Sequence, residues 1–249
     1  MFNSFKLLKL FLLLFILSTC NTSGTLDNDI LITDNTESNI IKNQELNIES
    51  TNEGPLSLLA LGDSYTIGEG VNEDERWPNQ FVQEAYENGI DFLSPRIIAE
   101  TGWKTYDLLN GIESSNFEKK YDYVSLLIGV NNQFNSRSIK EFENDLDKLL
   151  VKIKNLKKKD GSVIIISIPD WGSSPYGIGY DRNEISNEIN LFNNSLKKFA
   201  NINNLKYVDV TEISRRAINE TNLIASDNLH PSGIMYLEWA KKIFQVWID

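Results

Sequence analysis

The chain has 249 residues, of which 41% are hydrophobic and 24% are charged, and its formal net charge is −11. A single cysteine excludes an intramolecular disulfide framework and a cysteine-rich zinc site, and a single histidine excludes His-rich metal motifs such as HExxH. The negative charge argues against a nucleic-acid-binding protein, which needs a basic face to neutralise phosphates.

Residues 1–20 have the organisation of an export signal. Two lysines precede an apolar run at residues 10–17 that is too short to span a membrane. Cys20 follows at the expected cleavage point and resembles the cysteine of a bacterial lipobox, although Thr19 stands where Gly or Ala is usual. We therefore expect an exported, membrane-anchored bacterial lipoprotein, periplasmic or on the cell surface, with Cys20 as the lipidated residue. The alternative is an ordinary signal peptide with an incidental cysteine.

The next segment, residues 21–54, is typical of a solvated tether. It carries seven acidic residues and one lysine, and it contains no aromatic residue. A segment of this composition cannot bury enough apolar surface to fold by itself. We therefore expect one folded domain, over residues 55–249.

From residue 55 onward, strand patterns alternate with helix patterns. Short apolar runs predict five strands, at residues 56–61, 96–99, 121–128, 162–168 and 207–210. Apolar residues at helical spacing predict helices near residues 78–88, 105–109, 138–159, 185–199 and 232–247. This alternation predicts an α/β protein whose parallel sheet is covered on both faces. In such sheets ligands bind beyond the carboxyl ends of the strands.

Candidate catalytic residues follow the first three predicted strands. The first is followed by the sequence GDSY, in which Ser64 has an exposed hydroxyl beside free backbone N–H groups if it begins a helix. The second is followed by Gly102, where a backbone N–H can approach a ligand closely. The third is followed by Asn131, whose side-chain N–H can stabilise a developing oxyanion. Taken singly, each of these residues is also typical of an ordinary turn.

The loop before the last predicted helix holds the only histidine of the chain. His230 follows Asp227 by three residues, so the carboxylate can reach one nitrogen of the ring. Such a pairing fixes the tautomer and leaves the other nitrogen free to act as a general base. A lone histidine is usually structural, but the position of this one at the same sheet edge favours a catalytic role.

Together these motifs resemble the SGNH (GDSL-like) hydrolase family. GDSY at residues 62–65, Gly102, GVNN at residues 129–132 and DxxH at residues 227–230 have the order and spacing of that family. The resemblance spans nearly all of residues 56–249. It implies a three-layer α/β/α, flavodoxin-like fold with a five-stranded parallel sheet, and a site without metal or cofactor. It also implies esterase, lipase, deacetylase or thioesterase activity.

The resemblance assigns a role to each candidate. Ser64 would be the nucleophile, His230 the general base and Asp227 the residue that orients it. The oxyanion hole would comprise the backbone N–H groups of Ser64 and Gly102 and the side chain of Asn131. These roles are carried over by position from the family.

Two positions depart from the family pattern. Tyr65 replaces the commoner leucine, and Asn132 stands where the family usually has an aspartate after its conserved-block asparagine. That aspartate is a supporting residue, so the departure concerns local hydrogen bonding rather than the reaction.

The leading hypothesis is a monomeric serine esterase that hydrolyses acyl or acetyl esters of a lipid, a glycan or another small molecule. The alternatives are an acyltransferase that uses the same residues and a non-catalytic ligand-binding lipoprotein. The loop after the fourth predicted strand contains Asp170, Trp171 and Tyr176, which we expect to contact the substrate. Its aromatic residues are equally suited to packing a long loop.

Overall fold

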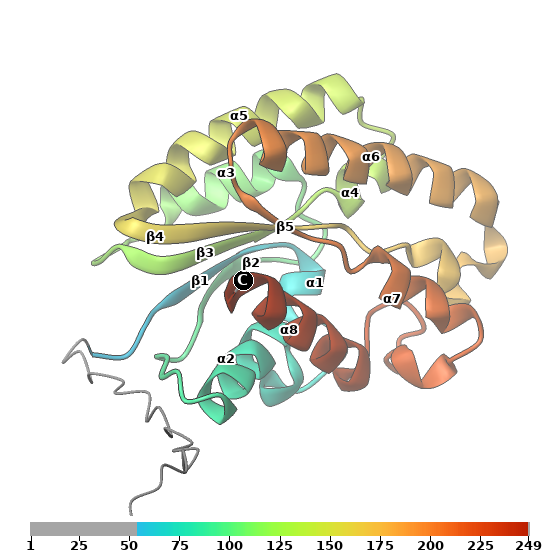
Figure 1. The fold of residues 1–249 in the computed structure, drawn as a ribbon. Helices are drawn as coiled ribbons and strands as arrows, with labels where there is room; N and C mark the ends of the chain where they lie inside the picture. Colours follow the sequence, from blue (N-terminus) through green and yellow to red (C-terminus); the bar gives the residue numbers. More distant parts are fainter. Residues whose placement is uncertain (1–53, 249) are drawn as a thin grey trace, which may run out of the picture. The chain divides into compact units, whose positions relative to one another are not determined.

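The computed structural model describes residues 54–248, and the predicted signal segment and the tether up to residue 53 lie outside the described residues. Five strands form one sheet in which every neighbouring pair is parallel, in the order β2-β1-β3-β4-β5 (Figure 1). The strands are β1 (Leu58–Gly62), β2 (Arg96–Ala99), β3 (Tyr121–Leu127), β4 (Lys157–Ile166) and β5 (Lys206–Val208). The predicted five-stranded parallel sheet is confirmed.

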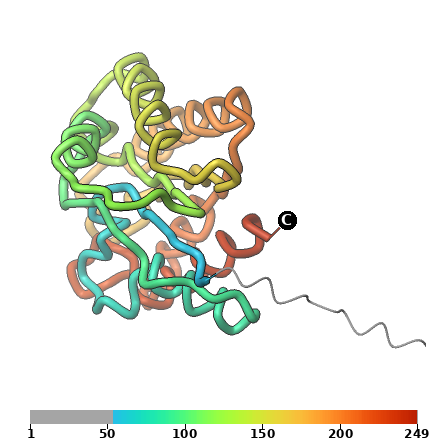
Figure 2. Tube along the Cα trace, turned by 90° about the vertical axis from the view of Figure 1, so that its left-hand side faces the viewer, coloured from blue at the N-terminus to red at the C-terminus, as the bar shows by residue number. Residues whose placement is uncertain are grey.

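Helices cover both faces of the sheet, as Figures 1 and 2 show. One face carries α3 (Thr105–Ser114), α5 (Ile139–Leu156) and α6 (Arg182–Ile202), and the other carries α2 (Trp77–Glu87) and α8 (Gly233–Ile248). Three short helices complete the α-helical set, namely α1 (Ser64–Ile67), α4 (Val130–Phe134) and α7 (Thr211–Arg215). The described residues also contain five single-turn helices, η1 (Glu73–Glu75), η2 (Trp171–Ser173), η3 (Pro175–Gly179), η4 (Arg216–Ile218) and η5 (Thr221–Leu223). The architecture is therefore the predicted three-layer α/β/α fold.

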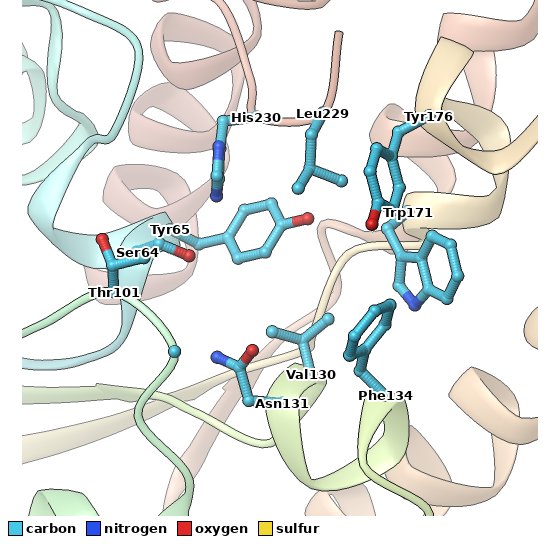
Figure 3. A pocket seen from close by; sticks show the side chains of 11 residues that line it. Ser64, Tyr65, Thr101, Val130, Asn131, Phe134, Trp171, Tyr176, Leu229 and His230 are labelled. Carbon is cyan, nitrogen blue, oxygen red and sulfur yellow. The ribbon is translucent and has the colours of Figure 1, made fainter. Parts of the chain in front are cut away.

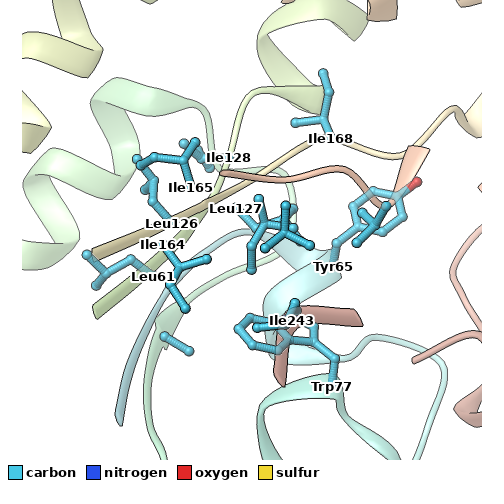
Figure 4. Packing of buried hydrophobic residues seen from close by; sticks show 14 of the residues in the cluster. Leu61, Tyr65, Trp77, Leu126, Leu127, Ile128, Ile164, Ile165, Ile168 and Ile243 are labelled. Carbon is cyan, nitrogen blue, oxygen red and sulfur yellow. The ribbon is translucent and has the colours of Figure 1, made fainter. Parts of the chain in front are cut away.

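The central strands are apolar on both sides because both sides are covered. Leu61 of β1, Leu126 and Leu127 of β3 and Ile164 and Ile165 of β4 are all buried in one core (Figure 4). Successive side chains of a strand point to opposite faces, so neighbours such as Leu126 and Leu127 enter different helix layers. This double burial explains why the strands are continuous apolar runs rather than alternating patterns.

Two predicted boundaries differ from the structure by five residues. Helix α3 runs to Ser114, whereas the sequence predicted its end at residue 109. Strand β4 begins at Lys157, whereas the sequence placed residues 157–159 at the end of the preceding helix. The early part of β4 is held by pairing of Lys157 with Tyr121 of β3 and by an ion pair of 2.8 Å between Lys158 Nζ and Asp122 Oδ1. These long-range partners decide the boundary.

The strand order places a switch point between β1 and β3. The chain passes from β1 to β2 on one side and then returns to β3 on the other, so the loops after β1 and β3 diverge and leave a crevice there. Helices α1 and α4 begin at this crevice, directly after their strands. Within residues 54–248, no helix has both the length and the hydropathy needed to cross a membrane, and no group of His, Cys, Asp and Glu is arranged to hold a metal ion.

Candidate active site

Ser64 stands at the end of β1, where the strand turns directly into a helix. Asp63 adopts an extended conformation as the N-cap of α1, and its Oδ1 accepts a hydrogen bond of 3.1 Å from the backbone N–H of Tyr65. Ser64 is therefore the first residue of α1, and its own backbone N–H lies among the free donors of a helix start. The short helix is tied back by Gly68, whose N–H donates to the Ser64 carbonyl.

Asp63, next to Ser64, lies in a fully buried position. Its second carboxyl oxygen, Oδ2, has no hydrogen-bond partner among the described residues. Burial raises the pKa of Asp63 to about 7, and the backbone hydrogen bonds of its Oδ1 oppose this shift only in part. A buried carboxyl in this position holds the turn through its cap, and it does not face the cavity that Ser64 lines.

His230 and Asp227 form a close pair in the loop before α8. His230 Nδ1 is 2.6 Å from Asp227 Oδ2, and the histidine side chain is only 7% exposed. The other carboxyl oxygen, Oδ1, accepts hydrogen bonds of 2.9 Å from the backbone N–H groups of Leu229 and His230. Partial burial raises the pKa of Asp227, but these three hydrogen bonds outweigh it and hold the pKa below its ordinary value. The carboxylate thus stays charged and fixes the proton of the imidazole on Nδ1.

Gly102 and Asn131 approach the serine from the two strands that flank β1. Gly102 follows β2 with φ of +80°, a backbone conformation that other residues rarely adopt. A Cβ built at this position would meet nothing within 4 Å, so the backbone conformation and not a lack of space favours glycine here. Asn131 lies in α4, and its Nδ2 donates a 3.1 Å hydrogen bond to the Trp103 carbonyl. One Nδ2 hydrogen remains for a ligand.

Asn132 replaces the supporting aspartate with a complete hydrogen-bond set of its own. Its Oδ1 accepts from the Thr105 backbone N–H at 3.1 Å, and its Nδ2 donates to the Thr105 hydroxyl at 2.9 Å. The same hydroxyl donates to Asp145 Oδ2 at 2.9 Å. An aspartate could not donate to Thr105, so the asparagine suits this environment. The network joins the start of α3 to α4 and thereby holds the loop that carries Gly102.

Ser64, Gly102, Asn131 and His230 line one cavity of about 190 Å³, shown in Figure 3. Its polar side is formed by Ser64, Thr101, Gly102, Asn131 and His230. Its apolar side is formed by Tyr65, Val130, Phe134, Trp171, Tyr176 and Leu229. In Figure 3 the aromatic rings of the second group lie on the far side of Tyr65 from Ser64 and Thr101. The structure therefore brings four of the five predicted catalytic and oxyanion residues to the wall of one pocket, with Asp227 bound directly to His230 behind it.

The three predicted substrate contacts divide into two groups. Trp171 and Tyr176 line the cavity, and the Trp171 indole is fixed by a 2.7 Å hydrogen bond from Nε1 to Gln133 Oε1. Asp170 does not line it. Its Oδ2 accepts from the Ser186 hydroxyl at 2.6 Å and from Arg215 Nε at 3.0 Å, and its side chain is fully buried. The prediction for Asp170 is therefore corrected: this carboxylate supports the loop and does not contact the cavity.

Four residues of the wall were not singled out from the sequence, namely Thr101, Val130, Phe134 and Leu229. Val130 and Phe134 are the first and last residues of α4 and therefore project from the same face of it, one turn apart. Their proximity in sequence to Asn131 is the only signal that could have found them. Thr101 and Leu229 likewise adjoin Gly102 and His230, and nothing in their residue type distinguishes them.

Comparison with known proteins gives one family. Residues 60–236 match the model of the GDSL-like Lipase/Acylhydrolase family. A multidomain esterase from Ruminococcus flavefaciens is 24% identical to the chain over 229 residues. That match covers 79% of this chain and 28% of the esterase, so the chain spans less than a third of that relative's length.

Solved structures share the fold. A lipolytic protein of the G-D-S-L family from Veillonella parvula has a TM-score of 0.62 and 19% identity, with 78% of this chain and 98% of that chain covered. An acetyl xylan esterase from Geobacillus stearothermophilus, solved as a variant, has a TM-score of 0.58 and 20% identity, with coverage of 77% and 94%. An esterase from a Pseudoalteromonas species has a TM-score of 0.60 and 16% identity, with coverage of 78% and 100%.

Proposed function

The chain belongs to the GDSL-like lipase/acylhydrolase family, and from this premise we propose that it is a serine esterase with Ser64 as nucleophile. The observation that carries the proposal is the arrangement of Ser64 and His230 on one cavity wall, with His230 Nδ1 held by Asp227 at 2.6 Å. This leaves His230 Nε2 as the unprotonated nitrogen and therefore as the base. Asp227 acts by holding the ring and its tautomer.

The reaction follows from these positions. Ser64 Oγ attacks the ester carbonyl carbon while its proton passes to His230 Nε2. The C–O bond to the alcohol then breaks, and Nε2 returns the proton to the departing alcohol oxygen. Water attacks the resulting acyl-enzyme by the same route and releases the acid and the free serine.

Negative charge that develops on the carbonyl oxygen is stabilised by three donors. The proposed donors are the backbone N–H groups of Ser64 and Gly102 and the remaining Nδ2 hydrogen of Asn131, and all three residues line the cavity. Donors that are already in place need no rearrangement during the reaction, which is why such sites contribute strongly to rate. The bond from Asn131 to Trp103 and the network around Asn132 keep these donors in place.

The size and lining of the cavity favour a short acyl group. Its volume of about 190 Å³ is little more than the ~150 Å³ cavity that holds a benzene molecule. Trp171 forms part of the cavity wall, and its nearly buried ring packs edge-on against Phe134 and Tyr180. The acetyl xylan esterases among the solved relatives act on an acetyl ester of a carbohydrate, and we propose a substrate of that chemical class, a short acyl ester of a hydroxyl-rich alcohol.

A series of nitrophenyl esters from acetyl to palmitoyl tests this function. We expect kcat/KM to be highest between acetyl and butyryl and at least about tenfold lower for palmitoyl, because overfilling a packed pocket is costly. The nitrophenyl leaving group is constant across the series, so the trend reports the acyl pocket alone. A rate that rises with chain length would contradict the short-acyl proposal.

Repeating the acetyl assay with added glycerol, and measuring free acetate against glycerol acetate, separates hydrolysis from acyl transfer.

We also propose that the enzyme is held at a membrane by a lipid on Cys20. The support is the basic and apolar order of residues 1–20 and the position of the cysteine. Each acyl chain adds ~0.8 kcal/mol per buried CH₂, so a multiply acylated cysteine anchors firmly. Cells that express the full chain should incorporate labelled palmitate into it, and Cys20→Ala should abolish the label. Equal labelling of the variant would show that Cys20 is not the lipidated residue and would leave the proposed esterase activity unaffected.

A further inference from the structure

One carboxylate beside His230 and Thr101, two residues that line the cavity, has no part in the proposed reaction. Glu69 Oε2 lies 4.0 Å from His230 Nε2, and it accepts a hydrogen bond from the Thr101 hydroxyl. The Glu69 side chain is 41% exposed, so it faces both the site and solvent. It therefore lies between the base and the segment that carries Gly102.

The backbone fixes this carboxylate close to the nucleophile. The N–H of Glu69 donates to the Ser64 carbonyl at 3.1 Å, which ties the residue to the start of α1. The next residue, Gly70, has φ of +84°, and a Cβ there would come within 3.1 Å of Asp227 Oδ2. The segment after α1 is thus packed against the loop that carries Asp227 and His230.

The proton transfer from His230 to the departing alcohol indicates which portion of the ester, acyl or alcohol, lies beside Glu69. His230 Nε2 must reach the oxygen of the departing alcohol within hydrogen-bond distance, so the alcohol portion of the ester lies beside Nε2. Glu69 Oε2 is next to that nitrogen, whereas the apolar rings lie on the other side of Tyr65 (Figure 3). Glu69 therefore adjoins the alcohol portion, and the rings adjoin the acyl portion.

No lysine or arginine on the described cavity wall offsets Glu69, which lies beside the lining residues Thr101 and His230. Lys104, two residues after Gly102, is 3.5 Å from Asp107 and is paired with it. An anionic alcohol portion would thus meet an uncompensated like charge, whereas a hydroxyl would find a charged acceptor.

We propose that Glu69 is a specificity-determining residue that selects alcohol portions carrying hydroxyl donors and rejects anionic ones. The proposal rests on the proposed esterase function and deepens it. In this proposal the preference for the charge and hydrogen-bonding groups of the alcohol depends on one side chain, whereas the preference for the acyl group depends on the acyl pocket.

Three acetates of matched two-carbon alcohols test the proposal: ethyl acetate, hydroxyethyl acetate and acetylglycolate. On the same acetyl–O–CH₂ group they carry a methyl, a hydroxymethyl or a carboxylate group. For the full-length enzyme we expect kcat/KM to be highest for hydroxyethyl acetate and about tenfold lower for acetylglycolate, with the difference mainly in KM. Glu69→Gln keeps the shape but removes the charge, and it should bring the acetylglycolate value to within about threefold of the hydroxyethyl value.

Two variants separate selection from a structural role. Glu73→Gln removes an exposed carboxylate of η1 that, unlike Glu69, bonds neither Thr101 nor His230, and it should leave all three values unchanged. Thr101→Val removes the hydroxyl that bonds Glu69 and should lower the three values by similar factors while keeping their order. If Glu69→Gln instead lowers all three alike, as a residue that only holds Thr101 would, the proposal is overturned. Absence of hydrolysis of any ester by the wild-type chain would instead overturn the esterase function itself.

Discussion

Ser64→Ala is expected to lower kcat for nitrophenyl acetate by about 10⁴-fold or more, to near the background rate. The covalent route requires the Ser64 hydroxyl, and the hydroxyl of Thr101 on the same cavity wall is hydrogen-bonded to Glu69. The substitution removes one oxygen at the first residue of a short helix whose cap is supplied by Asp63. The fold should therefore persist, which a thermal unfolding scan of the variant checks.

A matched control separates chemistry from packing in this experiment. Ser125 of β3 is buried, and its hydroxyl has no hydrogen-bond partner among the described residues. Ser125→Ala also removes one buried oxygen from the sheet, and it should leave kcat within about twofold because it touches no part of the cavity. A Ser64→Ala enzyme that kept more than a tenth of wild-type activity would exclude the acyl-enzyme route.

His230→Ala should be as damaging as Ser64→Ala, and the double variant should be no worse than either single variant. Residues that act as one unit lose their whole effect when any essential member is removed, so their costs do not add. The chain has no second histidine that could take over. Steady-state rates of the three variants, measured with nitrophenyl acetate, test the expectation. Multiplicative losses would show that Ser64 and His230 act separately.

Asp227→Asn tests whether Asp227 holds the ring proton of His230 on Nδ1. The asparagine Oδ1 can still accept from the backbone N–H groups of Leu229 and His230, so the loop should keep its shape. Its NH₂ would face Nδ1 in place of Oδ2, which forces Nδ1 to accept and places the ring proton on Nε2. A base that already carries a proton cannot accept the one from Ser64, and kcat should fall by about 10⁴-fold. Near-normal activity would mean that Asp227 has no role in orienting the base.

The sequence predicted the layers of the fold well because the strands are buried on both faces. Runs such as the one containing Leu126 and Leu127 can satisfy their environment only in a covered parallel sheet. Boundaries that depend on distant partners were less predictable. Helix α3 continues through Gly111, because the absence of a side chain there leaves room for the Trp103 ring. The early start of β4 likewise depends on partners in β3.

In the candidate site too, the positions that follow from strand topology were predictable and those that depend on distant contacts were not. Ser64, Gly102 and Asn131 each follow a strand, so parallel topology alone brings them to one edge. Asp170 also follows a strand, but its Oδ2 accepts hydrogen bonds from Ser186 of α6 and Arg215 of α7, which no local pattern reveals. The position of Glu69 beside His230 was equally hidden, because it depends on how two loops pack together.

The central claim is that Ser64 is a nucleophile activated by His230, and covalent labelling tests it most directly. A fluorophosphonate transfers its phosphonyl group to an activated serine with loss of fluoride, and peptide mass mapping locates the adduct. We expect one adduct per chain, on the peptide that contains Ser64, with no label on Ser64→Ala and strongly slowed labelling of His230→Ala. An adduct on another residue, or labelling at an equal rate without His230, would contradict it.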